Sequence, residues 1–227
     1  VSSKFILPDL AILDPLLTTN LPANITASTG IDAMVHAIEA FTSIKSNNNP
    51  VSKMLSIEAL KLLGSSIKTA VFDGHNINAR SNMLLGSMLA GKAFENSPLA
   101  AVHALAYPIG GLFNISHGLS NSLVLTSVMK FNSKNEETKK NYAYISPYVF
   151  KNLDNSKNDE FLCNNFIDGL ERLCKEINLH YRLRDLEIPE EACKLMASEA
   201  MKQTRLLVNN PRKIEESDAY NIYKSVW

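Results

Sequence analysis

The 227-residue chain lacks the features that mark secreted, membrane-spanning and nucleic-acid-binding proteins. Its three cysteines are an odd number and form no C-x-x-C clamp, which argues against a disulfide framework. We find no charged-then-apolar leader and no apolar run of about 18 residues. The 23 basic and 23 acidic residues cancel, and no basic cluster is interleaved with aromatic side chains. These absences predict a cytoplasmic protein with no membrane and no nucleic acid among its partners.

Helical periodicity dominates the chain after Pro22. Residues 1–22 contain short apolar runs broken by proline, so we expect a strand-like, extended leader there. Further along, apolar side chains recur every three or four residues, as they do at Cys163, Ile167, Leu170, Cys174 and Ile177. The sequence therefore predicts a mainly α protein, with about eight or nine helices within residues 23–227.

Local signals predict where several of these helices begin. Ser28 and Thr29 precede an apolar periodic segment, so either hydroxyl is expected to cap the first helix. Ser97 and Pro98 are expected to start a later helix that carries His103. His117 lies at the expected start of the next helix.

Four side chains in two parts of the sequence are candidates for one metal site. Asp32 and His36 are four residues apart and therefore share one face of a helix. His103 and His117 provide two more imidazoles, on either side of a turn that is rich in glycine and proline. One carboxylate and three imidazoles suit a borderline divalent ion such as Fe²⁺ or Zn²⁺.

Each candidate taken alone has a structural explanation. An Asp-x-x-x-His pair is more often a salt bridge than a pair of ligands, a single buried histidine is common, and an imidazole at a helix start can act as a cap. The metal interpretation is favoured because three of the five histidines lie in apolar segments, where an unpaired ring costs roughly 2 kcal/mol or more. His75 and His180 lie among polar turn residues and are expected at the surface.

Two further side chains lie one helical turn from the candidate ligands. Glu39 follows His36 and could accept a hydrogen bond from an imidazole N–H, or it could form an exposed salt bridge. Tyr107 follows His103, and its hydroxyl could face a substrate, or its ring could belong to the core. The residues alone leave both alternatives open.

Two segments resemble the metal-binding segments of the iron-containing (group III) alcohol dehydrogenases. Residues 29–40, TGIDAMVHAIEA, are similar to the first segment. Residues 101–111, AVHALAYPIGG, followed by NISHG at 114–118, are similar to the second. The leader LAILDP at 10–15 and the stretch from NPR at 210–212 to the end are also similar, so the resemblance extends over the whole chain.

The resemblance implies a helical C-terminal metal domain of the iron-containing alcohol dehydrogenase and dehydroquinate synthase-like architecture. It implies that Asp32, His36, His103 and His117 bind Fe²⁺, with Zn²⁺ as a possible replacement. In this family the metal acts as a Lewis acid while hydride passes between an alcohol or aldehyde substrate and NAD or NADP. Members of the family also lead us to expect a homodimer or a larger homo-oligomer.

Two more site residues follow only from the resemblance. Tyr107 stands where many members have a histidine near the nicotinamide, so we expect a catalytic role for it, although the change leaves the proton relay open. Phe94 matches a position that lines the substrate pocket in related enzymes.

The family also has an N-terminal α/β domain whose glycine-rich loop holds the cofactor, and this chain has nine glycines and no G-x-G-x-x-G. We therefore expect residues 1–22 to be the end of such a domain and residues 23–227 to be the metal domain. Two alternatives remain: a glycerol-dehydrogenase-like zinc enzyme, or a non-catalytic remnant that binds metal or forms dimers.

This domain assignment predicts that the chain alone binds metal but binds a dinucleotide poorly or not at all. Titration with NADH, followed by the fluorescence of the nicotinamide, is expected to show no saturable binding. Tight binding of NADH to this chain would refute the prediction.

Overall fold

The computed structural model of the chain describes residues 8–44, 47–151, 157–179 and 181–227. Every regular element within these ranges is a helix, which confirms the predicted mainly α class. None of the helices in these ranges is both long enough and apolar enough to cross a membrane. The α-helices, in chain order, are α1 (Ala23–Thr42), α2 (Pro50–Phe72), α3 (Ile77–Asn96), α4 (Ala101–Phe113), α5 (His117–Asn132), α6 (Glu136–Val149), α7 (Asp159–Glu176), α8 (Ala192–Met201), α9 (Thr204–Leu207) and α10 (Glu216–Ser225).

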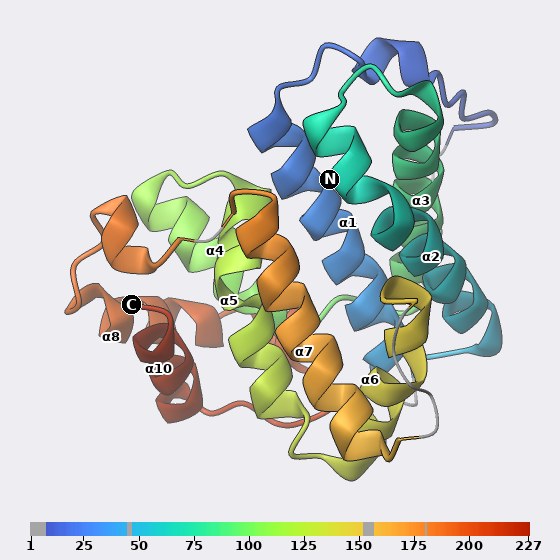
Figure 1. Cartoon of the computed structure of the whole chain (residues 1–227). Coiled ribbons are helices and arrows are strands. Elements are labelled where there is room, and N and C mark those ends of the chain that lie inside the picture. The colour runs from blue at the N-terminus through green and yellow to red at the C-terminus, as the bar shows by residue number, and fades with distance from the viewer. Residues whose placement is uncertain (1–7, 45–46, 152–156, 180) are drawn as a thin grey trace.

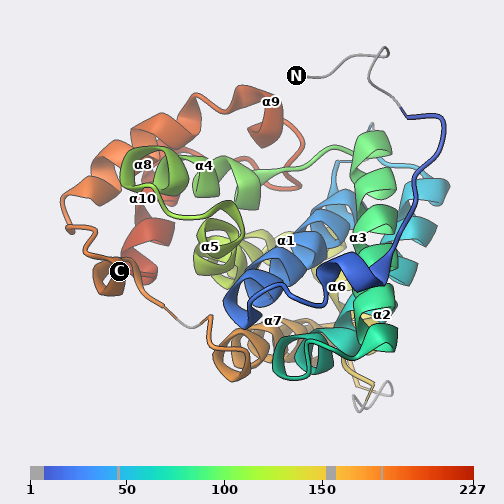
Figure 2. The same ribbon diagram turned by 90° about the horizontal axis from the view of Figure 1, so that it is seen from above.

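Helix α1 is the centre of the arrangement. It packs against α2 and α3 on one side and against α5 on the other, as the view from above shows (Figure 2). Beyond α5, helix α8 packs against both α4 and α10, while α6 packs against α7 and α2 (Figure 1). Most residues of α1 are buried, and they include apolar, hydroxyl and carboxylate side chains. Among the polar residues of α1, Thr26, Ser28, Glu39 and Thr42 are covered by the surrounding structure.

Asparagine caps explain where four of the helices begin. Asn49, Asn76, Asn135 and Asn158 each accept a hydrogen bond from the backbone amide three residues later, at the starts of α2, α3, α6 and α7. Such a bond satisfies one of the amides that a helix start leaves without an intrahelical partner. Helix α4 is different, because the residue before it is Ala100, whose side chain cannot accept a hydrogen bond.

The structure corrects two predicted helix starts. Helix α1 begins at Ala23, so Ser28 and Thr29 lie inside it and do not cap it. Their hydroxyls instead donate to the carbonyl of Ile25, at 3.2 and 2.8 Å. Helix α4 begins at Ala101 rather than near Ser97. Ser97 instead ends α3, and its hydroxyl donates to the carbonyl of Ala40 on α1 at 2.7 Å.

The described part of the predicted leader, residues 8–22, contains no strand. It has a single 3-10 turn, η2 (Pro15–Thr18), which Asp14 caps through the amide of Leu16 at 2.9 Å. Residues 1–7 of the leader lie outside the described residues. Arg80 of α3 holds the end of the leader, since its guanidinium donates to the carbonyl of Leu21 at 3.2 Å and to the hydroxyl of Thr26 at 2.7 Å.

Gly118, in the first turn of α5, allows this helix to cross α1 closely. A Cβ atom at this position would lie 2.4 Å from the carbonyl oxygen of Ser28 and 2.6 Å from its carbonyl carbon. Both are backbone atoms, so no rotation of a side chain can relieve the clash. The crossing of α1 and α5 therefore requires glycine here.

We expect Gly118→Ala to lower the free energy of unfolding by about 1–3 kcal/mol, because the two helices must separate to admit the methyl group. Gly91→Ala on α3 is the matched control, since a Cβ there meets no described atom within 4 Å. That change should leave stability equal or raise it by up to about 1 kcal/mol. Urea denaturation of both variants tests the difference, and equal stabilities would contradict it.

Candidate metal centre

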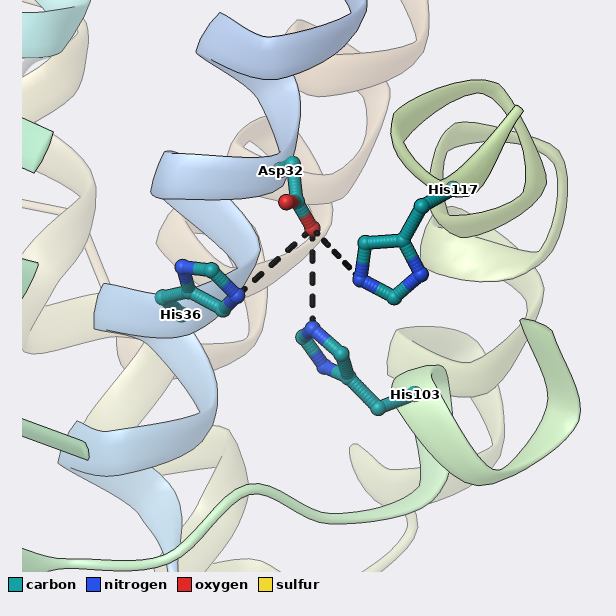
Figure 3. A group of neighbouring side chains, drawn as sticks. All are labelled: Asp32, His36, His103 and His117. Atoms are coloured by element: carbon teal, nitrogen blue, oxygen red, sulfur yellow. Dashed lines mark ion pairs between the residues drawn. The ribbon is translucent and has the colours of Figure 1, made fainter. Parts of the chain in front are cut away.

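The four predicted ligand side chains meet where α1, α4 and α5 come together (Figure 3). Asp32 and His36 lie on one face of α1, as their spacing requires. His103 is in the first turn of α4, and His117 is the first residue of α5. One ligand atom from each side chain lies within 4.8 Å of the other three.

The carboxylate of Asp32 is at the middle of the cluster. Its Oδ1 atom lies 3.7 Å from Nε2 of His36 and 3.5 Å from Nε2 of both His103 and His117. Three imidazole nitrogens and one carboxylate oxygen therefore point into one small volume (Figure 3). This is a donor set that borderline divalent ions accept.

The cluster has a closed side and an open side. The side chain of His103 is 1% exposed, whereas that of His117 is 45% exposed. Asp32 and His36 lie between these extremes. A small molecule can therefore approach the cluster from the side of His117.

One atom of the cluster shows that the residues fit a metal ion. Nε2 of His103 is buried and has no hydrogen-bond partner within the described part of the chain. A buried nitrogen left in this state costs about 1–3 kcal/mol. Since it points towards the Asp32 carboxylate and two other imidazoles, a cation bound among these groups would remove that cost.

Burial and neighbouring charges set the protonation of the cluster. Burial favours the neutral form of Asp32, but the surrounding imidazoles of His103, His36 and His117 outweigh it and lower its pKa. Burial lowers the pKa of His36 to about 4, against the opposing effect of Asp32. Burial also acts to lower the pKa of His103, but the carboxylates of Asp32 and Glu39 outweigh it and raise the value to about 9. An ionised Asp32 and a neutral His36 are the forms that bind metals, and a metal would compete with a proton at His103.

Glu39 fixes the orientation of His103. Its side chain is 5% exposed, and its Oε2 atom lies 2.7 Å from Nδ1 of His103. The same carboxylate accepts hydrogen bonds from the amides of Ala100 at 3.1 Å and Val102 at 2.6 Å. Of the two sequence alternatives, the structure therefore excludes the exposed salt bridge. Because Glu39 occupies Nδ1, it is Nε2 of His103 that faces the cluster.

Tyr107 and Phe94 flank the cluster on different helices. The ring of Tyr107 lies 5.9 Å from that of His117, and its side chain is exposed, which excludes the core alternative. The ring of Phe94, on α3, lies 4.8 Å from that of His36. Their roles in catalysis and substrate binding stay predictions.

Sequence reasoning missed Asn121 as a member of the site. Its Nδ2 atom donates to Oδ1 of Asp32 at 2.6 Å and lies 3.2 Å from Nε2 of His117. The available signal was its position one helical turn after His117, on the same face of α5. Of the remaining histidines, His75 is exposed and is not part of the cluster, and His180 lies outside the described residues.

The sequence matches a family model described as the C-terminal part of the Fe-containing alcohol dehydrogenase family, over residues 26–227. The chain is 38% identical to long-chain-alcohol dehydrogenase 1 of Geobacillus thermodenitrificans, over 100% of this chain and 56% of that protein. It is 36% identical to 1,3-propanediol dehydrogenase of Citrobacter freundii, over 97% of this chain and 56% of that protein. The chain thus spans about half the length of the curated relatives it matches.

Solved structures share the fold as well. The crystal structure of a 1,3-propanediol oxidoreductase matches with a TM-score of 0.89 at 34% identity, over 94% of this chain and 55% of that one. Sulfoacetaldehyde reductase from Bifidobacterium kashiwanohense, solved in complex with NAD⁺, matches with a TM-score of 0.86 at 27% identity. That match covers 100% of this chain and 56% of the reductase.

We expect Glu39→Ala to lower the free energy of unfolding by about 2–4 kcal/mol, because two buried amides and Nδ1 of His103 lose their acceptor. Glu58→Ala is the control, since Glu58 forms an exposed pair with Lys61 and its loss should change stability by about 0.5 kcal/mol or less. Denaturation in the presence of a chelator separates this effect from metal binding. Equal losses in the two variants would contradict the role assigned to Glu39.

Proposed function

Since this chain belongs to the Fe-containing alcohol dehydrogenase family, we propose that it forms the metal-binding part of an NAD(P)-dependent alcohol dehydrogenase. The proposed ligands are Asp32, His36, His103 and His117, and the proposed metal is Fe²⁺, which Zn²⁺ can replace. The observation that carries the proposal is the buried, unpartnered Nε2 of His103, directed at a carboxylate among two other imidazoles. A divalent ion bound there would supply a Lewis acid for the interconversion of an alcohol and an aldehyde or ketone.

Three side chains around the proposed ligands would orient a ligand, transfer a proton and contact the substrate. Glu39 holds His103 from the closed side. On the open side, the exposed Tyr107 presents a hydroxyl that could give or take the proton of the alcohol group. Phe94 beside His36 offers an apolar wall for the carbon chain of a substrate.

The proposed reaction also needs a nicotinamide cofactor to carry the hydride. The similarity to a reductase solved with NAD⁺ supports a dinucleotide as hydride carrier. We assign its binding to an α/β domain that residues 1–22 would complete, with residues 23–227 as the metal domain. The open side of the cluster, at His117 and Tyr107, is where the nicotinamide and the substrate would meet. A homodimer or a larger homo-oligomer is part of the same proposal.

The relatives favour this proposal over its rivals. Those with 38% and 36% identity are named as long-chain-alcohol and 1,3-propanediol dehydrogenases, which supports a primary alcohol or diol as the substrate class. A glycerol-dehydrogenase-like zinc enzyme and a non-catalytic remnant are not favoured by any of these similarities.

Metal content tests the ligand assignment. We expect the chain, purified without oxygen or chelators, to contain a stoichiometric amount of one transition metal, with iron expected over zinc. His103→Ala and His117→Ala should each lose it, because each removes one imidazole from the cluster. His75→Ala is the matched control and should keep its metal, since His75 is exposed and outside the cluster.

Elemental analysis of the four proteins, with circular dichroism to verify folding, gives a clear decision. Stoichiometric metal retained in both cluster variants would refute the ligand set. Folded wild-type chain that takes up neither iron nor zinc would refute the metal centre itself.

A further inference from the structure

The amide of Asn121 makes its hydrogen bonds to two of the proposed metal ligands. The side chain is fully buried in α5, and its amide nitrogen lies against two proposed ligands, Asp32 and His117. Its amide oxygen is buried and has no hydrogen-bond partner among the described residues. Both contacts of this side chain are therefore directed at the metal cluster.

The chemistry of the neighbours determines which way this amide points. The ionised carboxylate of Asp32 can only accept a hydrogen bond, so the –NH₂ group of Asn121 must face it. The same –NH₂ group, 3.2 Å away, then has its second N–H free for Nε2 of His117. The Nε2 lone pair that accepts this hydrogen bond is also the one that would bind a metal, so the amide holds the ring with Nε2 facing the cluster until a cation takes its place.

We propose that Asn121 is a positioning residue that holds Asp32 and His117 ready for the metal ion. The inference rests on the metal centre of the proposed function. Asn121 keeps the carboxylate and the exposed imidazole 3.5 Å apart when no cation does so. Without it, the two side chains are free to turn away, and the metal must order them as it binds.

A second buried asparagine on the same helix, Asn132, has both ends of its amide paired away from the cluster. Asn132 and Asn210 exchange two hydrogen bonds, at 3.0 and 2.8 Å, so the amide of Asn132 both donates and accepts. Asn121 donates to two ligand atoms and leaves its oxygen unpaired. Its buried oxygen carries an energetic cost that the contacts with the ligands offset.

Cobalt binding tests this role, with Co²⁺ as a spectroscopic probe. We expect Asn121→Ala to weaken Co²⁺ affinity about 10–100-fold, because residues that orient metal ligands contribute to affinity by that amount. The visible absorption bands of the bound Co²⁺ should also change in position or intensity, since the ligands are held less firmly. Asn121→Leu keeps the volume of the side chain and should show the same loss if the alanine variant folds poorly.

Asn132→Ala is the matched control, as a buried asparagine on the same helix that does not touch the cluster. It should melt at a lower temperature in chelator but bind Co²⁺ with unchanged affinity and spectrum. A measurement on the wild type needs no variant: addition of Zn²⁺ should shift the side-chain NH₂ resonances of Asn121 and leave those of Asn132 in place.

The outcomes distinguish a failure of the metal centre from a failure of the role proposed for Asn121. If the wild-type chain binds no Co²⁺, the metal centre fails, and this inference fails with it. If the wild type binds Co²⁺ and folded Asn121 variants bind it with the same affinity and spectrum, the positioning role is overturned while the metal centre stands. Unchanged Asn121 resonances on addition of Zn²⁺ would overturn the role in the same way.

Discussion

The buried carboxylate of Glu39 is the interaction on which the geometry of the site depends. A charge removed from water costs several kcal/mol unless donors surround it, and here the amides of Ala100 and Val102 and the ring of His103 do so. The two amides belong to the start of α4, where the positive end of the helix dipole also favours a carboxylate. Glu39 therefore caps the start of α4, which the side chain of Ala100 cannot do. The same carboxylate also fixes the orientation of the His103 ring.

This arrangement makes α1 the common frame of the site. Asp32 and His36 are part of α1, His103 is attached to it through Glu39, and α5 crosses it at Gly118, directly after His117. Because most of α1 from Thr26 onwards is buried, its position is determined by packing against α2, α3 and α5. The packing of α1 therefore positions all four proposed ligands, although His103 and His117 belong to α4 and α5.

The sequence predicts the helical class and the residues of the cluster, and it offers Glu39 as a possible partner of an imidazole, but it does not predict that this partner is His103 or that Glu39 also caps α4. Residue types and i, i+4 spacing are local properties, so Asp32 and His36 could be placed on one face of a helix in advance. The bond between Glu39 and the start of α4 spans 61 residues, and no local pattern encodes it. The wrong start of α1 has a local cause: Thr29 looks like a cap but bonds back to a carbonyl within the helix, an option open to any hydroxyl.

The four proposed ligands are not held equally. His103 is buried, and a hydrogen bond that also caps a helix holds its ring in place, so it cannot move without cost to the fold. His117 is 45% exposed, and its polar contacts are with the amide of Asn121 and the carboxylate of Asp32. In the proposed metal centre, the closed side would therefore hold one ligand in place, while the open side leaves His117 accessible beside Tyr107. A catalytic metal keeps one position open to substrate, and in the proposed centre that position would lie on the side of His117.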